Sequence, residues 1–155
     1  MKNIKNFLAA VQEAIGDVSG ILIQFPLYFG IMGIMKESGL ATLIAAQITN
    51  TANEITLPIY TFLSAGLLNM FVPSGGGQWQ IQAPIIIETA QKTGTSLAKM
   101  IMALAYGDQI TNMLQPFWAL PLLGITGLKA KDILPYTLVL FLTGFIIFTL
   151  SLIIF

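Results

Sequence analysis

Two short polar segments interrupt long apolar stretches of this 155-residue sequence. The segment Pro73-Ser74-Gly75-Gly76-Gly77 offers a hydroxyl group and three glycines, whose backbone a ligand can approach closely. The segment GDQITN, at 107–112, contains Asp108, the only charged residue between positions 100 and 128. Backbone N–H, hydroxyl and amide donors without a formal positive charge favour a small monoanion such as a carboxylate. Asp108 is the candidate for binding Na⁺ or carrying a proton.

The composition excludes most soluble functions. Hydrophobic residues make up 55% of the chain and charged residues 9%, with a mean hydropathy of +0.81, whereas soluble domains carry about 25% charged residues. A water-soluble enzyme is therefore excluded, and so is a nucleic-acid binder, which needs a basic surface. The absence of Cys and His removes disulfide, thiol and imidazole chemistry and the usual zinc and haem sites. We expect a membrane protein with no metal or cofactor beyond a coupling Na⁺ or H⁺.

The uncharged stretch from Ile55 to Ile87 is too long for one membrane crossing. As a straight helix its 33 residues would extend about 50 Å, against a hydrocarbon core of about 30 Å. The proline and three glycines at 73–77 are the strongest helix breaker in the chain. They predict a re-entrant hairpin over 55–91, with its tip at 73–79 and a return helix at 80–90. The alternative interpretation is a simple loop between two tilted spans.

The segment 97–125 is predicted to be a broken transmembrane helix. The Gly-Asp pair and Asn112 lie in its middle, with apolar sequence on both sides, so we place the break at 107–112. Pro116 supports a second half-helix there, because the first turn of a helix tolerates proline and an interior does not.

The rest of the chain completes a single all-α membrane domain. The predicted elements are an interfacial helix at 1–17, a transmembrane helix at 18–35, a short interfacial helix at 39–53 and a transmembrane helix at 133–155.

Two breaks at membrane depth point to function. Unpaired backbone groups facing lipid cost several kcal/mol each, so such breaks persist only within protein or along a cavity. Secondary transporters build their midplane sites from these parts. Asp108 is the predicted ion-coupling residue. The predicted substrate-binding residues are Ser74, Gly75, Gly76, Gly77, Gln78, Trp79, Thr111 and Asn112.

Several of these residues have an alternative, purely structural interpretation. Asp108 is either a coupling residue or a buried acid held by backbone N–H groups, and Trp79 is either part of the site wall or an interfacial residue. We expect Asn69 to bridge helices rather than contact a ligand. The many glutamines must face a cavity or one another.

The sequences FVPSGGGQWQIQAP, from Phe71, and GDQITNMLQPFWALPLLGI, from Gly107, resemble the bacterial short-chain fatty acid transporter family, the acetoacetate- and butyrate-type permeases. The resemblance covers nearly the whole chain, as the C-terminal portion of a longer family protein. It implies a relationship to the ion transporter superfamily, whose two inverted repeats each contain a re-entrant hairpin and a broken helix. The chain is then roughly one repeat of a multi-pass protein of the bacterial cytoplasmic membrane.

The favoured function is cation-coupled uptake, by symport, of a short-chain fatty acid such as acetoacetate or butyrate. The alternative is a repeat or truncated subunit that transports only with a partner, either an N-terminal half or further copies of this chain. The expected partners are thus a small carboxylate, the lipid bilayer and that second half, and no nucleic acid. An intramembrane enzyme is disfavoured, because Asp108 has no second acid on a matching face.

Overall fold

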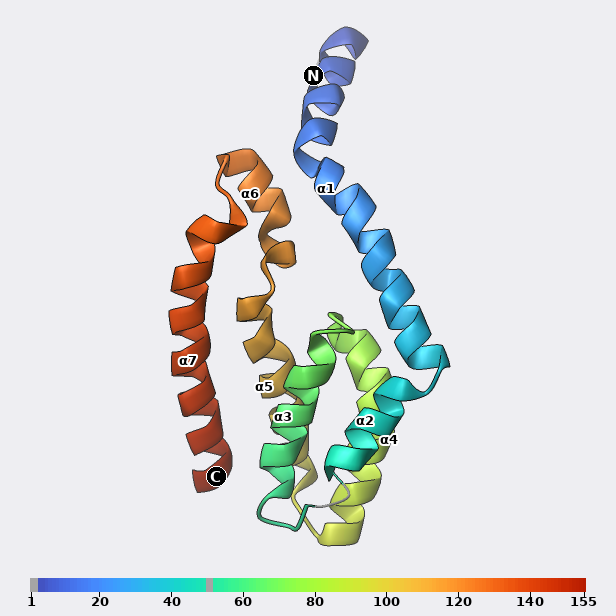
Figure 1. Cartoon of the computed structure of the whole chain (residues 1–155), viewed down its shortest axis with the longest axis vertical. Helices are drawn as coiled ribbons and strands as arrows, with labels where there is room; N and C mark the ends of the chain where they lie inside the picture. Colours follow the sequence, from blue (N-terminus) through green and yellow to red (C-terminus); the bar gives the residue numbers. More distant parts are fainter. Residues whose placement is uncertain (1–2, 50–51) are drawn as a thin grey trace.

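The computed structural model describes residues 3–49 and 52–155, and within them the fold is all-helical, without strands (Figure 1). This confirms the predicted all-α class. The helices are α1 (Ile4–Glu37), α2 (Leu40–Thr49), α3 (Leu57–Asn69), α4 (Gly75–Thr93), α5 (Leu97–Thr111), α6 (Leu120–Thr126) and α7 (Ala130–Ile154). Two 3₁₀ turns, η1 (Asn112–Leu114) and η2 (Pro116–Ala119), connect α5 to α6.

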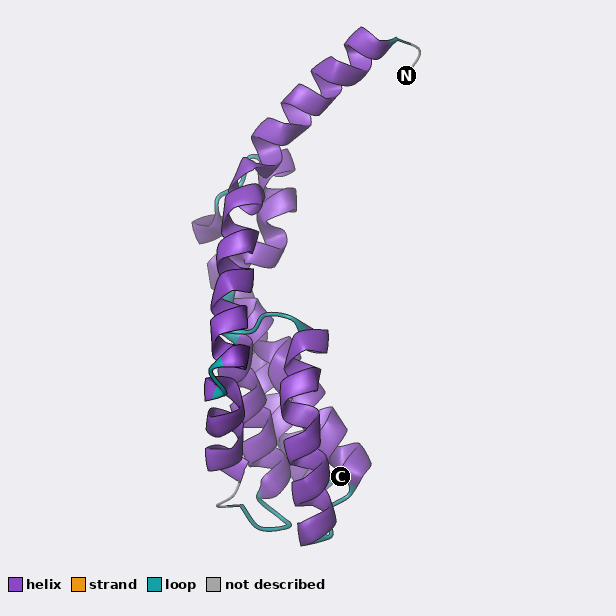
Figure 2. Cartoon of the chain, turned by 90° about the vertical axis from the view of Figure 1, so that its right-hand side faces the viewer, coloured by secondary structure: helices purple, strands orange, loops and turns teal. Residues whose placement is uncertain are grey.

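Helix α1 is continuous across position 17, where an interfacial helix at 1–17 was predicted to end and a transmembrane helix at 18–35 to begin. It begins after Asn3, whose side chain accepts a hydrogen bond from the Lys5 backbone N–H, and continues through Pro26. No glycine–proline cluster interrupts this stretch, so nothing ends the helix before Glu37. Gly39 then adopts a left-handed conformation, with φ of 72°, and α2 follows at an angle of 65°. The N-terminal part of α1 extends beyond the other helices (Figure 2).

Helices α3 and α4 form a helical hairpin that turns at the predicted proline (Figure 1). The turn is shorter than the predicted tip at 73–79, because the Ser74 side chain caps α4 and Gly75 already starts the helix. The return helix is correspondingly longer than 80–90, and it ends at Gly94 in a left-handed conformation, with φ of 77°. Its re-entrant placement in a membrane stays a prediction.

The irregular stretch between α5 and α6 lies at 112–119, further along the chain than the break placed at 107–112. Gly107 and Asp108 stay helical because α5 is packed against α3 at this point. A Cβ on Gly107 would lie 2.3 Å from the Phe62 carbonyl oxygen. The regular helix ends only beyond this contact, where Pro116 pushes Gln115 into an extended conformation.

Helix α5 lies between α3 and α7 (Figure 1). Aromatic contacts hold α7 in place: the Tyr106 and Phe148 rings stack with centroids 4.3 Å apart, and those of Phe62 and Phe145 are 5.4 Å apart. Most of α7 remains exposed. Within the described residues, α7 is the one helix long and apolar enough to cross a membrane alone, and the bent α1–α2 pair passes the same test as a unit.

We predict that Gly107→Ala lowers the free energy of unfolding by about 1–3 kcal/mol, because the methyl group forces α3 and α5 apart. Gly33→Ala is the matched control, since a Cβ at this position in α1 meets no atom within 4 Å. Alanine there gains up to about 1 kcal/mol in helix propensity. Denaturant titration of the detergent-solubilised chain, monitored by circular dichroism, measures the free energy of unfolding of both variants. Equal effects of the two substitutions would contradict the close-packing interpretation.

Candidate functional site

The predicted site residues lie where α4 begins and α5 ends, and Asn69 connects the end of α3 to the end of α5. Its amide nitrogen donates to the Asp108 backbone oxygen, to Thr111 Oγ1 and to Asn112 Oδ1, each at 2.9 Å. Asn69 is only 1% exposed. The last carbonyl groups of a helix lack intrahelical donors, so this amide caps the C-terminal turn of α5. The expectation that Asn69 bridges helices is confirmed.

The start of α4 lies directly beside Asp108. Ser74 Oγ accepts a hydrogen bond from the Gly77 N–H at 3.3 Å, which leaves the N–H groups of Gly75 and Gly76 at the helix terminus. Both glycines are exposed. A Cβ built on Gly75 would lie 3.4 Å from Asp108 Oδ2. The half-buried carboxylate of Asp108 therefore faces the positive end of the α4 dipole.

Gln78, a predicted substrate ligand, forms hydrogen bonds within the protein. It is completely buried, and its amide donates to the Ala65 carbonyl oxygen at 2.7 Å and to Gln82 Oε1 at 2.8 Å. Gln82 in turn donates to Ser64 Oγ at 3.2 Å. These bonds lock α4 to α3, and they confirm that glutamines face one another. Trp79, the next residue, is 39% exposed.

Two residues outside the predicted set complete the network. Gln115 is buried, and its amide donates to the Asn69 backbone oxygen at 3.1 Å. Trp118 donates from its indole N–H to the Asn112 backbone oxygen at 2.7 Å. Gln115 is one of the glutamines expected to face a cavity or one another, and its position directly before Pro116 in an otherwise apolar stretch is the sequence signal that marks it.

The network has more acceptors than donors. The side-chain oxygens of Asn69, Gln78 and Gln115 are buried and have no hydrogen-bond partner. An unsatisfied buried acceptor costs about 1–3 kcal/mol. Amide and carboxylate oxygens are the ligands that hard cations prefer. No group of three or more His, Cys, Asp or Glu residues gathers in the described part of the chain. Any cation here would therefore be held mainly by neutral oxygens.

An apolar groove of about 270 Å³ adjoins the network between α3, α5 and α7. Thr111 lines it next to Gly66, where a Cβ would lie 3.2 Å from the Thr111 methyl group. The remaining lining residues are Phe62, Leu63, Leu67, Met70, Ile110, Leu114, Phe141 and Phe145. The groove places an apolar surface beside polar groups, as an amphiphilic ligand requires.

Comparison with known proteins identifies the family. The family described as "Short chain fatty acid transporter" matches residues 1–155, which is the whole chain. The chain belongs to the short-chain fatty acid transporter family. Two relatives, from Escherichia coli and Haemophilus influenzae, both carry the name "Putative short-chain fatty acid transporter". The resemblance in the polar segments is thereby confirmed, and these names describe transporters rather than enzymes.

The chain is 47% identical to the E. coli protein over 149 residues, which make up 96% of the chain and 34% of that protein. It is 48% identical to the H. influenzae protein over 130 residues, or 84% of the chain and 29% of that protein. The chain thus spans about a third of the length of these curated relatives. No solved structure matches it.

We predict that Asn69→Asp destabilises the chain by about 3–5 kcal/mol, because it replaces a buried amide donor with a carboxylate beside the Asp108 backbone oxygen, which has no hydrogen to offer. Asn53→Asp is the matched control. Asn53 is exposed, and its Oδ1 only accepts hydrogen bonds, from the Ile55 and Thr56 N–H groups and the Thr56 hydroxyl. Denaturant titration of both variants in detergent compares their free energies of unfolding. A loss of stability in Asn53→Asp as large as that in Asn69→Asp would refute the assigned donor role.

Proposed function

We propose that the chain forms part of a secondary transporter of the bacterial cytoplasmic membrane, which takes up short-chain fatty acids such as acetoacetate or butyrate by symport with Na⁺ or H⁺. The observation that carries the proposal is the position of the Asp108 carboxylate near the first turn of α4, where a Cβ built on Gly75 would lie 3.4 Å from Asp108 Oδ2. Family membership supports transport. The names of the two relatives support the class of substrate.

The contact between Asp108 and α4 gives a physical reason for coupling. The glycine N–H groups of α4 suit a substrate carboxylate, but Asp108 already places a negative charge there. Two carboxylates about 5 Å apart repel each other by about 3 kcal/mol at an effective dielectric constant of about 20. A cation or proton on Asp108 removes this repulsion. Binding of the ion therefore favours binding of the substrate, and the coupling is reciprocal.

The network supplies the remaining parts of this proposed site. The unpartnered oxygens of Asn69, Gln78 and Gln115 supplement Asp108 as ligands for Na⁺. Thr111 and Asn112 contribute hydroxyl and amide groups on the side of α5. The groove beside Thr111 suits the short alkyl chain of the substrate. Ser74 and Gln78 act mainly through the hydrogen bonds that position α4.

Membrane placement follows from the apolar helices. Helix α7 spans the bilayer in this proposal, and α3 with α4 re-enters it so that the two polar turns lie at the same depth. The exposed apolar surface of α7 then faces lipid or the rest of the transporter. Several crossings by the complete protein make it a multi-pass protein.

The chain length favours the second candidate, a repeat that needs a partner half. The chain spans about a third of the relatives it matches. The start of α4 also lies open, since Gly75, Gly76 and Trp79 are exposed. A symmetric carrier would close this opening with a second repeat, from an N-terminal half or from another copy of the chain.

Butyrate uptake into proteoliposomes tests the proposed function. We expect no saturable uptake by the folded chain alone. Uptake driven by a Na⁺ or proton gradient should appear when the chain is reconstituted together with the part of a family protein that it does not cover. Gradient-driven uptake by the chain alone would contradict the need for a partner half. Absence of uptake in both preparations, with folded protein in the bilayer, would contradict the transport assignment.

We predict that Asp108→Asn abolishes stabilisation by Na⁺. An ion that binds only the native state stabilises it by about 2.7 kcal/mol at about a hundred times its Kd. Unfolding is measured in NaCl and in choline chloride at equal ionic strength. Glu88→Gln is the control, because Glu88 is an exposed acid paired with Lys92 at 2.6 Å and far along α4. Equal responses of Asp108→Asn and the unmodified chain would exclude Asp108 as the Na⁺ ligand.

A further inference from the structure

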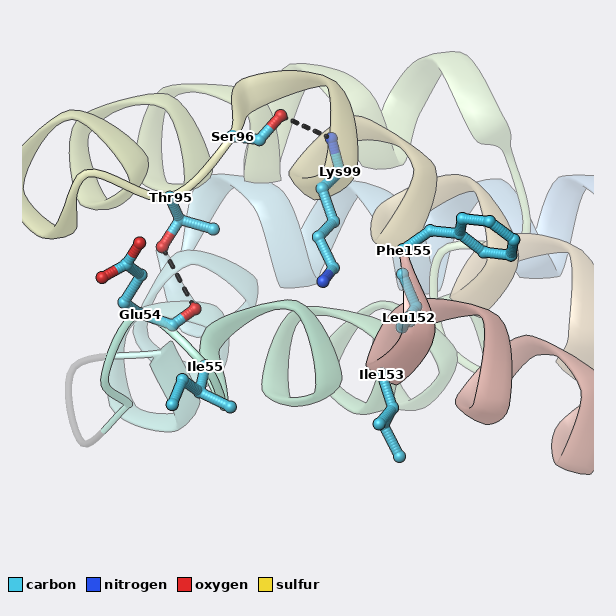
Figure 3. A pocket seen from close by; sticks show the side chains of 8 residues that line it. All are labelled: Glu54, Ile55, Thr95, Ser96, Lys99, Leu152, Ile153 and Phe155. Carbon is cyan, nitrogen blue, oxygen red and sulfur yellow. Dashed lines mark hydrogen bonds between the residues drawn. The ribbon is translucent and has the colours of Figure 1, made fainter.

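A second charged pocket lies at the other end of α5, where the C-terminal end of α7 meets the start of α3 (Figure 3). It measures about 470 Å³, and its walls carry both Lys99 and Glu54. Lys99 is nine residues before Asp108, or about 13 Å along the helix. This pocket is therefore separate from the proposed transport site.

The two charged side chains are not paired with each other. Among the described residues, neither Lys99 nor Glu54 has an ion-pair partner within 4 Å. Figure 3 shows the half-buried Lys99 side chain extending from α5 toward α3, with the end of α7 on one side and Glu54 on the other, next to Thr95. A pocket with one separated positive and one separated negative group complements a ligand that carries both charges.

The pocket continues into a hollow between α5 and α7. Lys99 and Ser96 lie at its polar end, and Met102, Tyr106 and Leu152 line its apolar part. From Lys99 to Tyr106 this surface extends about 10 Å along α5. The stacked rings of Tyr106 and Phe148 lie where it ends. A polar end followed by an elongated apolar surface matches a headgroup attached to an acyl chain.

The position along α7 favours a lipid. Helix α7 is the one described helix that can span a bilayer alone, and Leu152 and Ile153 of the pocket lie at its C-terminal end. If α7 spans, as the proposed function requires, Lys99 lies at the depth of the lipid headgroups. Lysine side chains commonly reach toward this interface.

We propose that this pocket binds a zwitterionic phospholipid with a primary ammonium group, of the phosphatidylethanolamine type. Lys99 binds the phosphate, Glu54 accepts hydrogen bonds from the ammonium group, and an acyl chain lies along Met102 and Leu152. This inference rests on the membrane placement in the proposed function but not on transport itself.

The test measures lipid binding by native mass spectrometry of the purified chain in detergent, with phosphatidylethanolamine, phosphatidylglycerol and phosphatidylcholine of equal chain length. The unmodified chain should prefer phosphatidylethanolamine to both others. Lys99→Gln should weaken phosphatidylethanolamine binding at least about tenfold, since it removes a charge-assisted contact. Glu54→Gln should abolish the preference over phosphatidylglycerol.

Both substitutions leave the local backbone bonds intact. The Lys99 N–H donates to Ser96 Oγ, and the Thr95 hydroxyl donates to the Glu54 backbone oxygen, neither of which involves the altered groups. Lys131→Gln is the control for Lys99→Gln, because Lys131 is an exposed lysine at the opposite end of α7. Glu88→Gln is the control for Glu54→Gln.

Three outcomes would overturn the proposal. They are equal binding of all three lipids, binding of phosphatidylglycerol as tightly as phosphatidylethanolamine, or an unchanged affinity in Lys99→Gln. Failure of the proposed function can be distinguished from failure of this lipid-binding proposal. A chain that does not insert into bilayers refutes the membrane placement, whereas an inserted chain without selective lipid binding refutes only this pocket assignment.

Discussion

The close crossing of α3 and α5 determines the arrangement of the candidate site. Gly107 allows the two backbones to touch, because any side chain there would overlap the Phe62 carbonyl group. At this separation the Asn69 amide reaches three acceptors on the last turn of α5. The same crossing keeps Asp108 on a regular helix and directs its carboxylate at Gly75. A wider separation would break both contacts at once, because each extends over a single hydrogen-bond or van der Waals distance.

The balance of donors and acceptors bears on the proposed coupling between ion and substrate. The amide hydrogens of Asn69, Gln78 and Gln115 are used within the protein, while the oxygens of the same three groups remain unpartnered. The Asp108 carboxylate lies near Gly75 at the start of α4, so this region of the chain has an excess of negative and partially negative groups. Such a region favours a cation over an anion. This excess supports the proposed coupling, in which a cation or proton on Asp108 favours binding of the substrate carboxylate.

The sequence predicted the all-helical class and the hairpin turn because these depend on local properties, but it placed the second break at 107–112 rather than at 112–119. Charge-free length shows that 55–87 must turn, and proline with three glycines shows where. The exact bounds of the helices depend on capping and on contacts between helices. Ser74 shortens the hairpin turn by capping α4, and contact with α3 keeps Gly107 and Asp108 helical. The roles of Gln78 and Gln115 depend on which carbonyl groups lie opposite them, and only the folded chain determines that.

The open side of the site agrees with the proposed need for a second repeat. Asn69, Gln78 and Gln115 are buried within this chain, whereas Gly75, Gly76 and Trp79 are exposed. The groups that hold the helices together therefore lie within this chain, and those proposed to bind the substrate are open on one side. A site with this division can fold within one repeat and still require a second surface to exclude water around a bound carboxylate. Exclusion of water strengthens every charge interaction in the site, so the proposed coupling between ion and substrate becomes effective only when the second wall is present.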